Sequence, residues 1–559
     1  MALKHAGQII ADALHRQGVE IIFGVPGESF LPALDGLVTY QSQIQFVTTR
    51  QEGGAAYMAE AYGKLTGKPG VLMVTRGPGA SNAAIGLHTA YQDSTPMVVL
   101  IGQVGTDMAE REAFQEIDYR RMFAQSAKWV GSIDRADRVD EYISHAFHLA
   151  QSGRPGPVVL ALPEDVLFAK AEAKPVEVAH LVRPGINQAD FDRAVSLLSD
   201  AKSPMVLVGG GAWTSEACRH LEMWAERQNI PVATSFRAQD LIRGDHPCYA
   251  GDLGIAPNPL LAQRVKDADV ILAIGPRLGE MTTSGYSLFE VPVTKQKVIH
   301  VHVGINELGS VYRPELAINS SYDLFCELLN QSRIQFSIPD AFSGQAAHKA
   351  YLEFNEPLTV GSEVEMAQMV SKLNEILPKD AIIANGAGNF AAWVHRFYRY
   401  GGFSQGQRTQ LAPTNGSMGY GLPAAIAAKL SFPKRVVVAF CGDGDFMMNC
   451  QELATCAGYG AYPIVIVVNN GMLGTIRMHQ EREYTNRVIA TKLTNPDFVK
   501  FAESFGMPGY RVTKTDEFYS VIKEAISSPK GALIEIQTDP NIISPTKKIS
   551  DFTKLKKEA

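Results

Sequence analysis

The chain has 559 residues, long enough for about three domains of ~100–200 residues each. Hydrophobic residues make up 46% and charged residues 20%, which is typical of globular proteins. The formal net charge of −6 argues against a nucleic-acid partner, because phosphate contacts favour a basic surface. No apolar run reaches the roughly 18 residues of a membrane span, so we expect no membrane partner either.

The first residues predict a helix rather than a secretory signal. Ile9, Ile10 and Leu14 have helical spacing, with charged residues between and around them. The six cysteines form no Cys-x-x-Cys pair, which indicates buried thiols in a reducing compartment. We therefore expect a cytoplasmic protein.

Short apolar strands alternate with helical patterns along the whole chain. They are continuously apolar rather than alternating, as in VLMVT, MVVLIG, PMVLVGG, VILAIG, VIHVHV, RVVVAF and IVIVV. Such strands are buried on both faces, which is typical of parallel sheets between helix layers. The pattern predicts an α/β protein with doubly wound parallel sheets.

Two polar, Pro-rich stretches, 171–185 and 337–357, read as linkers. They predict domains at 1–170, 185–335 and 358–545, followed by a Lys-rich tail, 546–559, that we expect to be mobile or lid-like. The first and third segments share a layout: a strand, a Gly-x-Gly turn, a helix and a Pro-led strand. This favours an old duplication that produced two similar sheets facing one another.

The stretch GDGDFMMNCQELATCAGYGAYPIVIVVNN contains the most informative motif. RVVVAFC predicts a strand that ends at the turn around Asp443, and IVIVV predicts the next parallel strand, ending at Asn470. In a right-handed crossover both loops lie at the carboxyl edge of one sheet. A carboxylate and an amide oxygen there suit Mg²⁺ that also binds a ligand's phosphates, and the glycines let backbone N–H groups approach those phosphates.

A calcium loop is a poor alternative for this stretch, because Met447, Met448 and Ala454 stand where a ligand oxygen, a glycine and a glutamate belong. Gly-Asp-Gly followed after 24 residues by Asn-Asn at a strand end resembles the thiamin diphosphate (ThDP) motif. That resemblance implies Mg²⁺ bound by Asp443, Asn470 and the backbone carbonyl of Met472.

A second carboxylate matches the other half of a ThDP site. ThDP needs an acid that hydrogen-bonds its pyrimidine nitrogen, and Glu52 stands after a strand at a helix start. Taken alone, Glu52 is better explained as a carboxylate that complements a helix dipole. However, RQEGGAAYMAEAYGKLTGKPGVLMVTRGPGASN resembles the pyrimidine-binding domain of the acetolactate synthase family. That resemblance places the activating glutamate at Glu52 and cofactor contacts at Pro78 and Asn82.

The same resemblance assigns the diphosphate half. Met418, in LAPTNGSMGYG, would be the apolar wedge beneath the cofactor, although a methionine there is otherwise core filler. Gly388 and Asn389 match the diphosphate loop, although the family has Gln-His where Asn389 and Phe390 stand. The remaining implied cofactor contacts are Gly416, Gly442, Gly444, Asp445, Leu473 and Gly474. In this family each site forms across a subunit interface, which implies a homodimer or homotetramer.

The resemblance further implies decarboxylation of a 2-oxoacid, pyruvate first, and ligation of the product to a second carbonyl. GQV…AFQE…K matches the synthases and lacks a decarboxylase's histidine pair, which places Phe114, Gln115 and Lys128 in the pocket with Gly27. A surface amphipathic helix is the alternative for the first three. His479 and Met281 replace the family's second-substrate tryptophan and arginine. His479 is therefore either a polar pocket residue or merely exposed.

Other activities stay open at this point. The altered pocket is also compatible with a 2-hydroxyacyl-CoA lyase, an oxalyl-CoA decarboxylase or another 2-oxoacid decarboxylase. A catalytically silent ThDP-binding subunit is disfavoured because Glu52, Asp443 and Asn470 are all present. A nicotinamide oxidoreductase is disfavoured because no acidic residue ends the strand IPVATSF.

The middle segment raises the question of a flavin. Acetolactate synthases carry FAD there, and Gly209, Gly210, Gly211 and Arg277 match its site, although a strand-Gly-helix turn is often purely structural. The family's Asp-Ile-Asp strand end is 302–304, His-Val-Gly, in this chain. FAD, an ADP- or CoA-type nucleotide and an empty domain all remain open.

Overall fold

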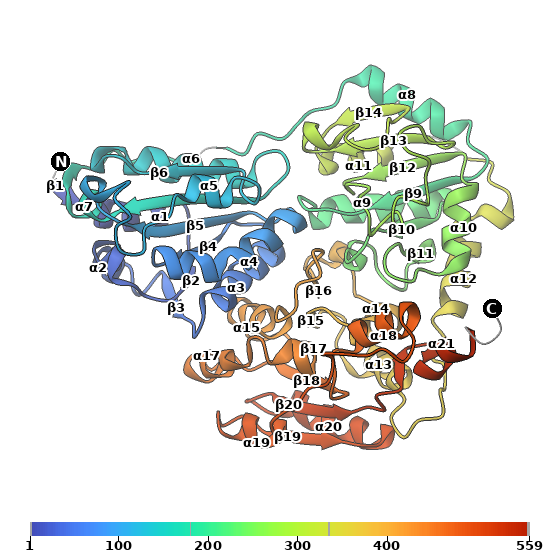
Figure 1. Cartoon of the computed structure of the whole chain (residues 1–559). Coiled ribbons are helices and arrows are strands. Elements are labelled where there is room, and N and C mark those ends of the chain that lie inside the picture. Colours follow the sequence, from blue (N-terminus) through green and yellow to red (C-terminus); the bar gives the residue numbers. More distant parts are fainter. Residues whose placement is uncertain (1–2, 179, 334–335, 556–559) are drawn as a thin grey trace.

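The computed structural model describes residues 3–178, 180–333 and 336–555. Three six-stranded, fully parallel sheets follow one another along the chain, each flanked by helices (Figure 1). This confirms the predicted α/β fold class. Because every strand of these sheets pairs in parallel, the connections run back over the sheet faces as helices, which bury both faces.

The N-terminal sheet has the strand order β3-β2-β4-β5-β7-β6. Its strands are β2 (Ile21–Gly24), β3 (Gln45–Thr48), β4 (Gly70–Val74), β5 (Met97–Gln103), β6 (Trp129–Ser132) and β7 (Pro157–Pro163). Its helices are α1 (Ala6–Arg16), α2 (Leu31–Val38), α3 (Glu52–Thr66), α4 (Gly77–Asp93), α5 (Tyr119–Phe123), α6 (Val139–Gln151) and α7 (Glu164–Phe168). A small antiparallel pair, β1 (Leu3–His5) with β8 (Lys170–Glu172), brings the two ends of this domain together.

The middle sheet has the order β11-β10-β9-β12-β13-β14. Its strands are β9 (Pro204–Val208), β10 (Val232–Thr234), β11 (Tyr249–Asp252), β12 (Val270–Ile274), β13 (Lys297–His302) and β14 (Leu316–Asn319). Its helices are α8 (Gln188–Ser199), α9 (Ser215–Gln228), α10 (Pro259–Asp267), α11 (Tyr322–Gln331) and α12 (Gly344–Phe354). Numbered within the sheet, this is 3-2-1-4-5-6, the order of dinucleotide-binding domains, with a switch point between β9 and β12.

The C-terminal sheet has the order β16-β15-β17-β18-β20-β19. Its strands are β15 (Ile382–Asn385), β16 (Gln410–Leu411), β17 (Val437–Gly442), β18 (Ile464–Asn469), β19 (Gly509–Val512) and β20 (Ala532–Gln537). Its helices are α13 (Met366–Ile376), α14 (Phe390–Phe397), α15 (Gly421–Ser431), α16 (Asp443–Phe446), α17 (Leu453–Tyr459), α18 (Gly474–Glu483), α19 (Phe498–Glu503) and α20 (Thr515–Ser527).

The first and third sheets share one topology. Numbered within each sheet, both have the order 2-1-3-4-6-5, which supports the duplication inferred from the shared layout. Two local expectations need correction. The stretch 337–357, predicted as a linker, contains α12, which packs against β11 of the middle sheet. The segment after the Gly-Asp-Gly turn is not one helix: it breaks between α16 and the 3₁₀ turn Cys450–Glu452, where Asn449 donates a hydrogen bond to the carbonyl of Gly419 at 2.8 Å.

The Lys-rich tail, expected to be mobile or lid-like, begins with defined structure. A short antiparallel pair, β21 (Ile542–Ser544) with β22 (Lys547–Lys548), leads into α21 (Ile549–Leu555). The side chain of Phe552 is buried, and α21 packs against α18. The last residues of the tail, 556–559, lie outside the described residues.

Helices α3 and α15 join the N-terminal and C-terminal domains. They pack side by side in the centre of the molecule (Figure 1), and one hydrophobic core runs through both domains. Neither helix has a polar face, because small apolar residues surround each axis; such helices are buried.

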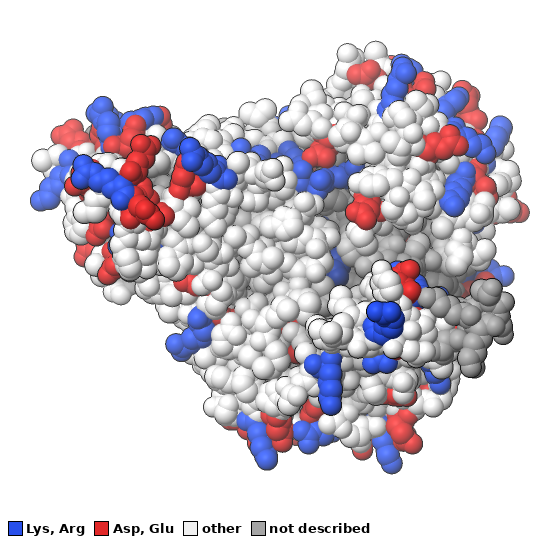
Figure 2. All heavy atoms as spheres, in the orientation of Figure 1, with Lys and Arg blue, Asp and Glu red and all other residues white. Residues whose placement is uncertain are grey.

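The surface shows no concentration of one charge. On the face seen in Figure 2, acidic and basic side chains are interspersed at the periphery, and few of either lie over α3 and α4. No helix among the described residues is long and apolar enough to cross a membrane. All six cysteines are free, and only Cys450 is not fully buried.

Candidate active site at the carboxyl edge of the C-terminal sheet

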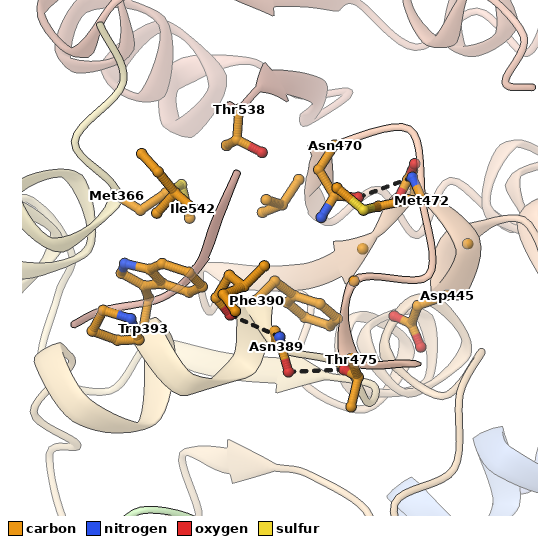
Figure 3. A pocket seen from close by; sticks show the side chains of 18 of the residues that line it. Met366, Asn389, Phe390, Trp393, Asp445, Asn470, Met472, Thr475, Thr538 and Ile542 are labelled. Atoms are coloured by element: carbon orange, nitrogen blue, oxygen red, sulfur yellow. Dashed lines mark hydrogen bonds between the residues drawn. The ribbon is translucent and has the colours of Figure 1, made fainter. Parts of the chain in front are cut away.

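A cavity of about 260 Å³ lies where β15, β17 and β18 end, and its lining residues all belong to the C-terminal domain (Figure 3). The switch point of this sheet falls between β15 and β17, where the loops diverge and leave a crevice. Every cofactor contact predicted for this domain lines the cavity: Gly388, Asn389, Gly416, Met418, Gly442, Asp443, Gly444, Asp445, Asn470, Met472, Leu473 and Gly474.

Asp443 is the first residue of α16, directly after β17, and is 2% exposed. Its Oδ2 accepts hydrogen bonds from the backbone N–H of Gly471 at 3.0 Å and from the Asn495 amide at 2.7 Å. Burial raises the pKa of its carboxyl, although these donors act in the opposite direction. A cation in the cavity would offset the burial and favour the ionised form.

The twin asparagines at the end of β18 differ: Asn469 is the last residue of the strand, and Asn470 follows it. Asn470 lines the cavity (Figure 3). Asn469 does not line it; its amide nitrogen donates to Glu535 at 2.7 Å, and its Oδ1 accepts from the N–H of Gly471 at 3.1 Å. Successive side chains of an extended segment point to opposite sides. Asn470 also contacts the loop, since its Oδ1 accepts from the N–H of Met472 at 3.1 Å, but only Asn470 lines the cavity as well.

Asp445 is the second carboxylate of the turn. Its Oδ1 accepts from the N–H groups of Gly419 at 2.7 Å and Ala387 at 3.3 Å, while its buried Oδ2 has no hydrogen-bond partner. Burial raises the pKa of Asp445 to about 7. An unsatisfied buried oxygen that lines a cavity indicates a missing donor.

The cavity suits a phosphate and a divalent cation. No group of three or more His, Cys, Asp and Glu residues that could hold a metal occurs among the described residues. A cation bound by Asp443 and Asn470 would therefore need further oxygens from backbone carbonyls and a ligand, as Mg²⁺ accepts. Gly416, at φ +70°, would have no atom within 4 Å of an added Cβ, so that side of the cavity is open.

The cavity is polar at one end and apolar at the other (Figure 3). The apolar end is lined by Leu358, Val360, Met366, Trp393, Ile542 and Ile543. Asn389 stands between the two ends: its amide donates to the carbonyl of Ile543 at 2.7 Å, and its Oδ1 accepts from the Thr475 hydroxyl at 2.9 Å. The loop after β15 is thereby tied to the C-terminal segment.

The predicted pyrimidine half lies on the N-terminal domain, outside this cavity. Glu52 begins α3, and its Oε2 accepts a hydrogen bond from the Asn82 amide at 2.9 Å. The glutamate is half-buried, and Asn82 and Pro78 are exposed. At the same edge, an added Cβ on Gly27 would clash with Thr75, which precedes α4. This half of the predicted site therefore opens onto the surface of the chain.

Family models describe all three domains. A thiamine pyrophosphate enzyme N-terminal TPP binding domain matches residues 4–122, a central domain of such enzymes matches 191–329, and their C-terminal TPP binding domain matches 386–536. A relative that is 32% identical over 550 residues aligns with 95% of this chain and 92% of its own length. The chain belongs to the thiamine pyrophosphate enzymes. Thiamine pyrophosphate and ThDP are the same cofactor.

That relative is a probable acetolactate synthase large subunit of Methanocaldococcus jannaschii. The acetolactate synthase large subunit of Haemophilus influenzae is 31% identical over 550 residues, covering 95% of this chain and 94% of its own. The acetolactate synthase isozyme 2 large subunit of Escherichia coli is 28% identical over 536 residues, covering 96% of each chain. This ThDP enzyme is thus related to acetolactate synthases over nearly its whole length.

The structure separates the predicted substrate-pocket residues. Phe114 is 73% exposed, and the Gln115 backbone packs against Gly77 at the start of α4, at the edge that carries Glu52. Lys128 lies elsewhere: its ammonium donates to the carbonyls of Leu149 and Ser152 at the end of α6.

Burial lowers the pKa of Lys128 to about 8. Its contacts are those of a helix-terminating lysine, and they leave its ammonium away from the cavity of the ThDP enzyme. His479 is exposed on α18, and its Nδ1 accepts from Arg482 at 2.9 Å. Thr475 and Ile476, on the first turn of the same helix, line the cavity instead.

The glycines of the middle domain are explained by packing. Gly210 has φ +74°, and an added Cβ would lie 2.3 Å from the carbonyl oxygen of Gly275. A Cβ on Gly275 would lie 2.4 Å from the carbonyl oxygen of Gly209. The Trp213 indole N–H donates to that same Gly209 carbonyl at 2.8 Å. The turns after β9 and β12 therefore touch directly at the switch point.

The residues at the carboxyl edge of the middle sheet lack the contacts by which such domains usually bind a dinucleotide. The second strand, β10, ends at Thr234 without a carboxylate for a ribose. The ring of His302 accepts from the N–H of Gly304 at 2.9 Å, and burial lowers its pKa to about 4. Arg277 contacts Glu307 at 3.4 Å and Gln92 at 3.1 Å, which joins two domains.

Several residues around the site carry no sequence signal of their own. Arg237 reaches from the middle domain and donates to the carbonyls of Pro413 and Gly386, next to Asp445. Tyr57, on α3, donates to the carbonyl of Met418 at 3.2 Å. Only the packing of three domains brings these side chains to the loops of the cavity.

Proposed function

We propose that this ThDP enzyme uses Mg²⁺, decarboxylates a 2-oxoacid, pyruvate first, and ligates the remaining two-carbon unit to a second carbonyl. The observation that carries the proposal is the joint placement of Asp443, Asn470 and the glycine turns around the polar end of one cavity. The names of the relatives, acetolactate synthase large subunits, support the choice of reaction.

In this proposal, Asp443, the Asn470 amide oxygen and the Met472 carbonyl hold the cation. Backbone N–H groups of the glycine turns bind the diphosphate, and Asp445 accepts a donor at its free Oδ2. Met418 supports the ring system from below. When bound, ThDP supplies a nucleophilic carbon and an electron sink for loss of CO₂. The residues supply position, charge and exclusion of water.

Glu52 would hold a proton at the pyrimidine nitrogen. Its hydrogen bond to Asn82 leaves Oε1 without a side-chain donor and orients the carboxyl at the start of α3. A carboxyl that shares a proton with a ring nitrogen needs a dry environment. In the single chain Glu52 is half-exposed, so a further surface must cover it.

A second copy of the chain is the proposed cover, giving a homodimer or a homotetramer. The face over α3 and α4 carries few charges (Figure 2). It exposes Ile85 at 42%, and Met447 and Met448, beside the metal turn, are 39% and 54% exposed. Exposed apolar residues near both halves of the site are typical of a subunit interface. The diphosphate half of one copy would then meet the pyrimidine half of the other.

The test is turnover of pyruvate with ThDP and Mg²⁺, followed by identification of the product. Acetolactate as the product would support the full proposal despite His479 and Met281. Acetaldehyde alone would keep the decarboxylation and reject the ligation. If pyruvate is not consumed while ThDP binds, the donor is wrong, and a panel of larger 2-oxoacids and acyl-CoA esters decides the substrate class.

A further inference from the structure

A buried carboxylate of the C-terminal domain contacts the backbone directly in front of Glu52. Glu452 ends the 3₁₀ turn before α17 and is 0% exposed. Its Oε1 accepts from the N–H of Gln51 at 3.1 Å, and its two oxygens accept from the N–H of Arg50 at 3.2 and 3.3 Å. Arg50 and Gln51 are each more than 400 positions away from Glu452 in the sequence.

These two N–H groups precede the first turn of α3 and have no helical partner. Gln51 is the N-cap, in an extended conformation at φ −155°. Its own Oε1 accepts from the next free donors, Gly53 at 2.6 Å and Gly54 at 3.1 Å. Buried N–H groups without acceptors destabilise a fold. Side-chain oxygens therefore bind the backbone on both sides of Glu52.

The surroundings of Glu452 are shaped for this contact. An added Cβ on Gly54 would lie 2.8 Å from Oε1 of Glu452, so the glycine makes room for the carboxylate. The Thr455 hydroxyl donates to Oε2 at 2.6 Å and holds the group in place. Burial raises the pKa of Glu452, while these donors favour its charged form. Glu452 therefore makes a specific, hydrogen-bonded contact between the C-terminal and N-terminal domains.

Glu452 follows Asp443 by nine residues in the same crossover. We propose that Glu452 is a positioning residue that sets the orientation of Glu52. The inference rests on the proposed function, in which Glu52 activates the cofactor. In a dimer with shared sites, this contact connects the activating carboxylate of one site to the metal turn of the other. A shift of the turn at one site would thereby move Glu52 at its neighbour.

The test uses the full-length variants Glu452→Ala and Glu452→Gln. The first readout needs no cofactor: amide hydrogen exchange of the peptide that contains Arg50 and Gln51. We expect exchange at least about tenfold faster in the alanine variant, because two backbone donors lose their buried acceptor. The glutamine variant keeps one acceptor oxygen, so we expect an intermediate rate.

The second readout is deuterium exchange of the thiazolium-carbon proton in bound ThDP. We expect Glu452→Ala to slow it about tenfold or more while ThDP affinity changes less than about threefold, because the positioned group acts on the pyrimidine and not on the diphosphate. Asp269→Ala is the matched control. Its carboxylate binds the N–H groups of Lys202 at 2.6 Å and Ser203 at 3.0 Å in the middle domain.

The outcomes separate the two proposals. Wild-type rates of proton exchange in both Glu452 variants would overturn the positioning role. Equal slowing in Asp269→Ala would also overturn it, since the effect would then be general loosening. If the wild-type chain does not bind ThDP, the proposed function fails, and the amide readout alone reports on the contact. Should the alanine variant not fold, the same two rates in Glu452→Gln decide.

Discussion

The hydroxyl of Tyr420 donates a 2.5 Å hydrogen bond to the carboxylate of Glu60 across the boundary between the C-terminal and N-terminal domains. Glu60 lies on α3, two turns after Glu52, and its other oxygen accepts from the Thr95 hydroxyl at 2.7 Å. One turn further, Lys64 donates to the carbonyl of Ala412 at 2.8 Å. The helix that starts at Glu52 is thus attached to the C-terminal domain along its length.

The buried Glu60 predicts a pH dependence of stability. Burial raises its pKa from 4.5 to about 6, so the folded chain binds this proton more tightly than the unfolded chain. Stability from this group is therefore present below pH 4.5 and is lost as the pH rises to about 6. The unfolding free energy of the wild type should therefore fall between pH 4.5 and about pH 6. In Glu60→Gln this fall should be smaller, by up to about 2 kcal/mol.

Denaturant unfolding at a series of pH values measures this change. Glu503→Gln, an exposed position on α19, is the control and should leave the profile unchanged. A Glu60→Gln profile identical to that of the wild type would show that Glu60 does not titrate in this range.

The twin asparagines predict opposite phenotypes. Asn470→Ala should weaken Mg²⁺-dependent ThDP binding at least about tenfold with only a small change in Tm, because its side chain faces the cavity and makes a single hydrogen bond to the described part of the chain, from the Met472 N–H. Asn469→Ala should instead lower the unfolding free energy by ~1–3 kcal/mol, because Glu535 and Asn495 both lose a partner. Titration calorimetry and thermal melts of the two variants distinguish them; a reversed pattern would contradict the assignment.

Glu52→Gln predicts a loss of activation without a loss of binding. The amide cannot share a proton with the pyrimidine nitrogen, so proton exchange at the thiazolium carbon should fall by about two orders of magnitude or more. ThDP affinity should stay close to that of the wild type, because the residues proposed to bind the diphosphate lie on the C-terminal domain. Glu141→Gln, exposed on α6, is the control. Full activity in Glu52→Gln would reject its role.

The packed switch point predicts a protein that purifies without flavin. Visible absorbance should show no flavin band, and added FAD should not raise the Tm. Gly210→Ala should lower the unfolding free energy by ~1–3 kcal/mol, because its φ of +74° and its contact with Gly275 exclude a Cβ. A yellow protein with bound FAD, which Gly210→Ala releases while the fold stays stable, would contradict this interpretation.

Local patterns in the sequence were enough for the diphosphate half of the site. Asp443 and Asn470 each follow a continuously apolar strand, and in a parallel sheet such positions share one edge. The hydrophobic pattern of a strand and the residue types of a turn are local properties, so they can be recognised in the sequence alone. The helix break before Glu452 could not be predicted in this way, because it depends on Asn449 contacting Gly419, 30 residues away.

The sequence by itself determined the fold class, the position of the Gly-Asp-Gly turn at a sheet edge and the start of α3 at Glu52. Only the tertiary structure decided that Lys128 caps α6, that the glycines of the middle domain pack on one another, and that Glu452 holds the backbone before Glu52. The first two outcomes depend on contacts within one domain, and the third depends on which surfaces meet when two domains pack. Hydrogen bonds and steric contacts between distant segments have no period along the chain, so only the assembled structure reveals them.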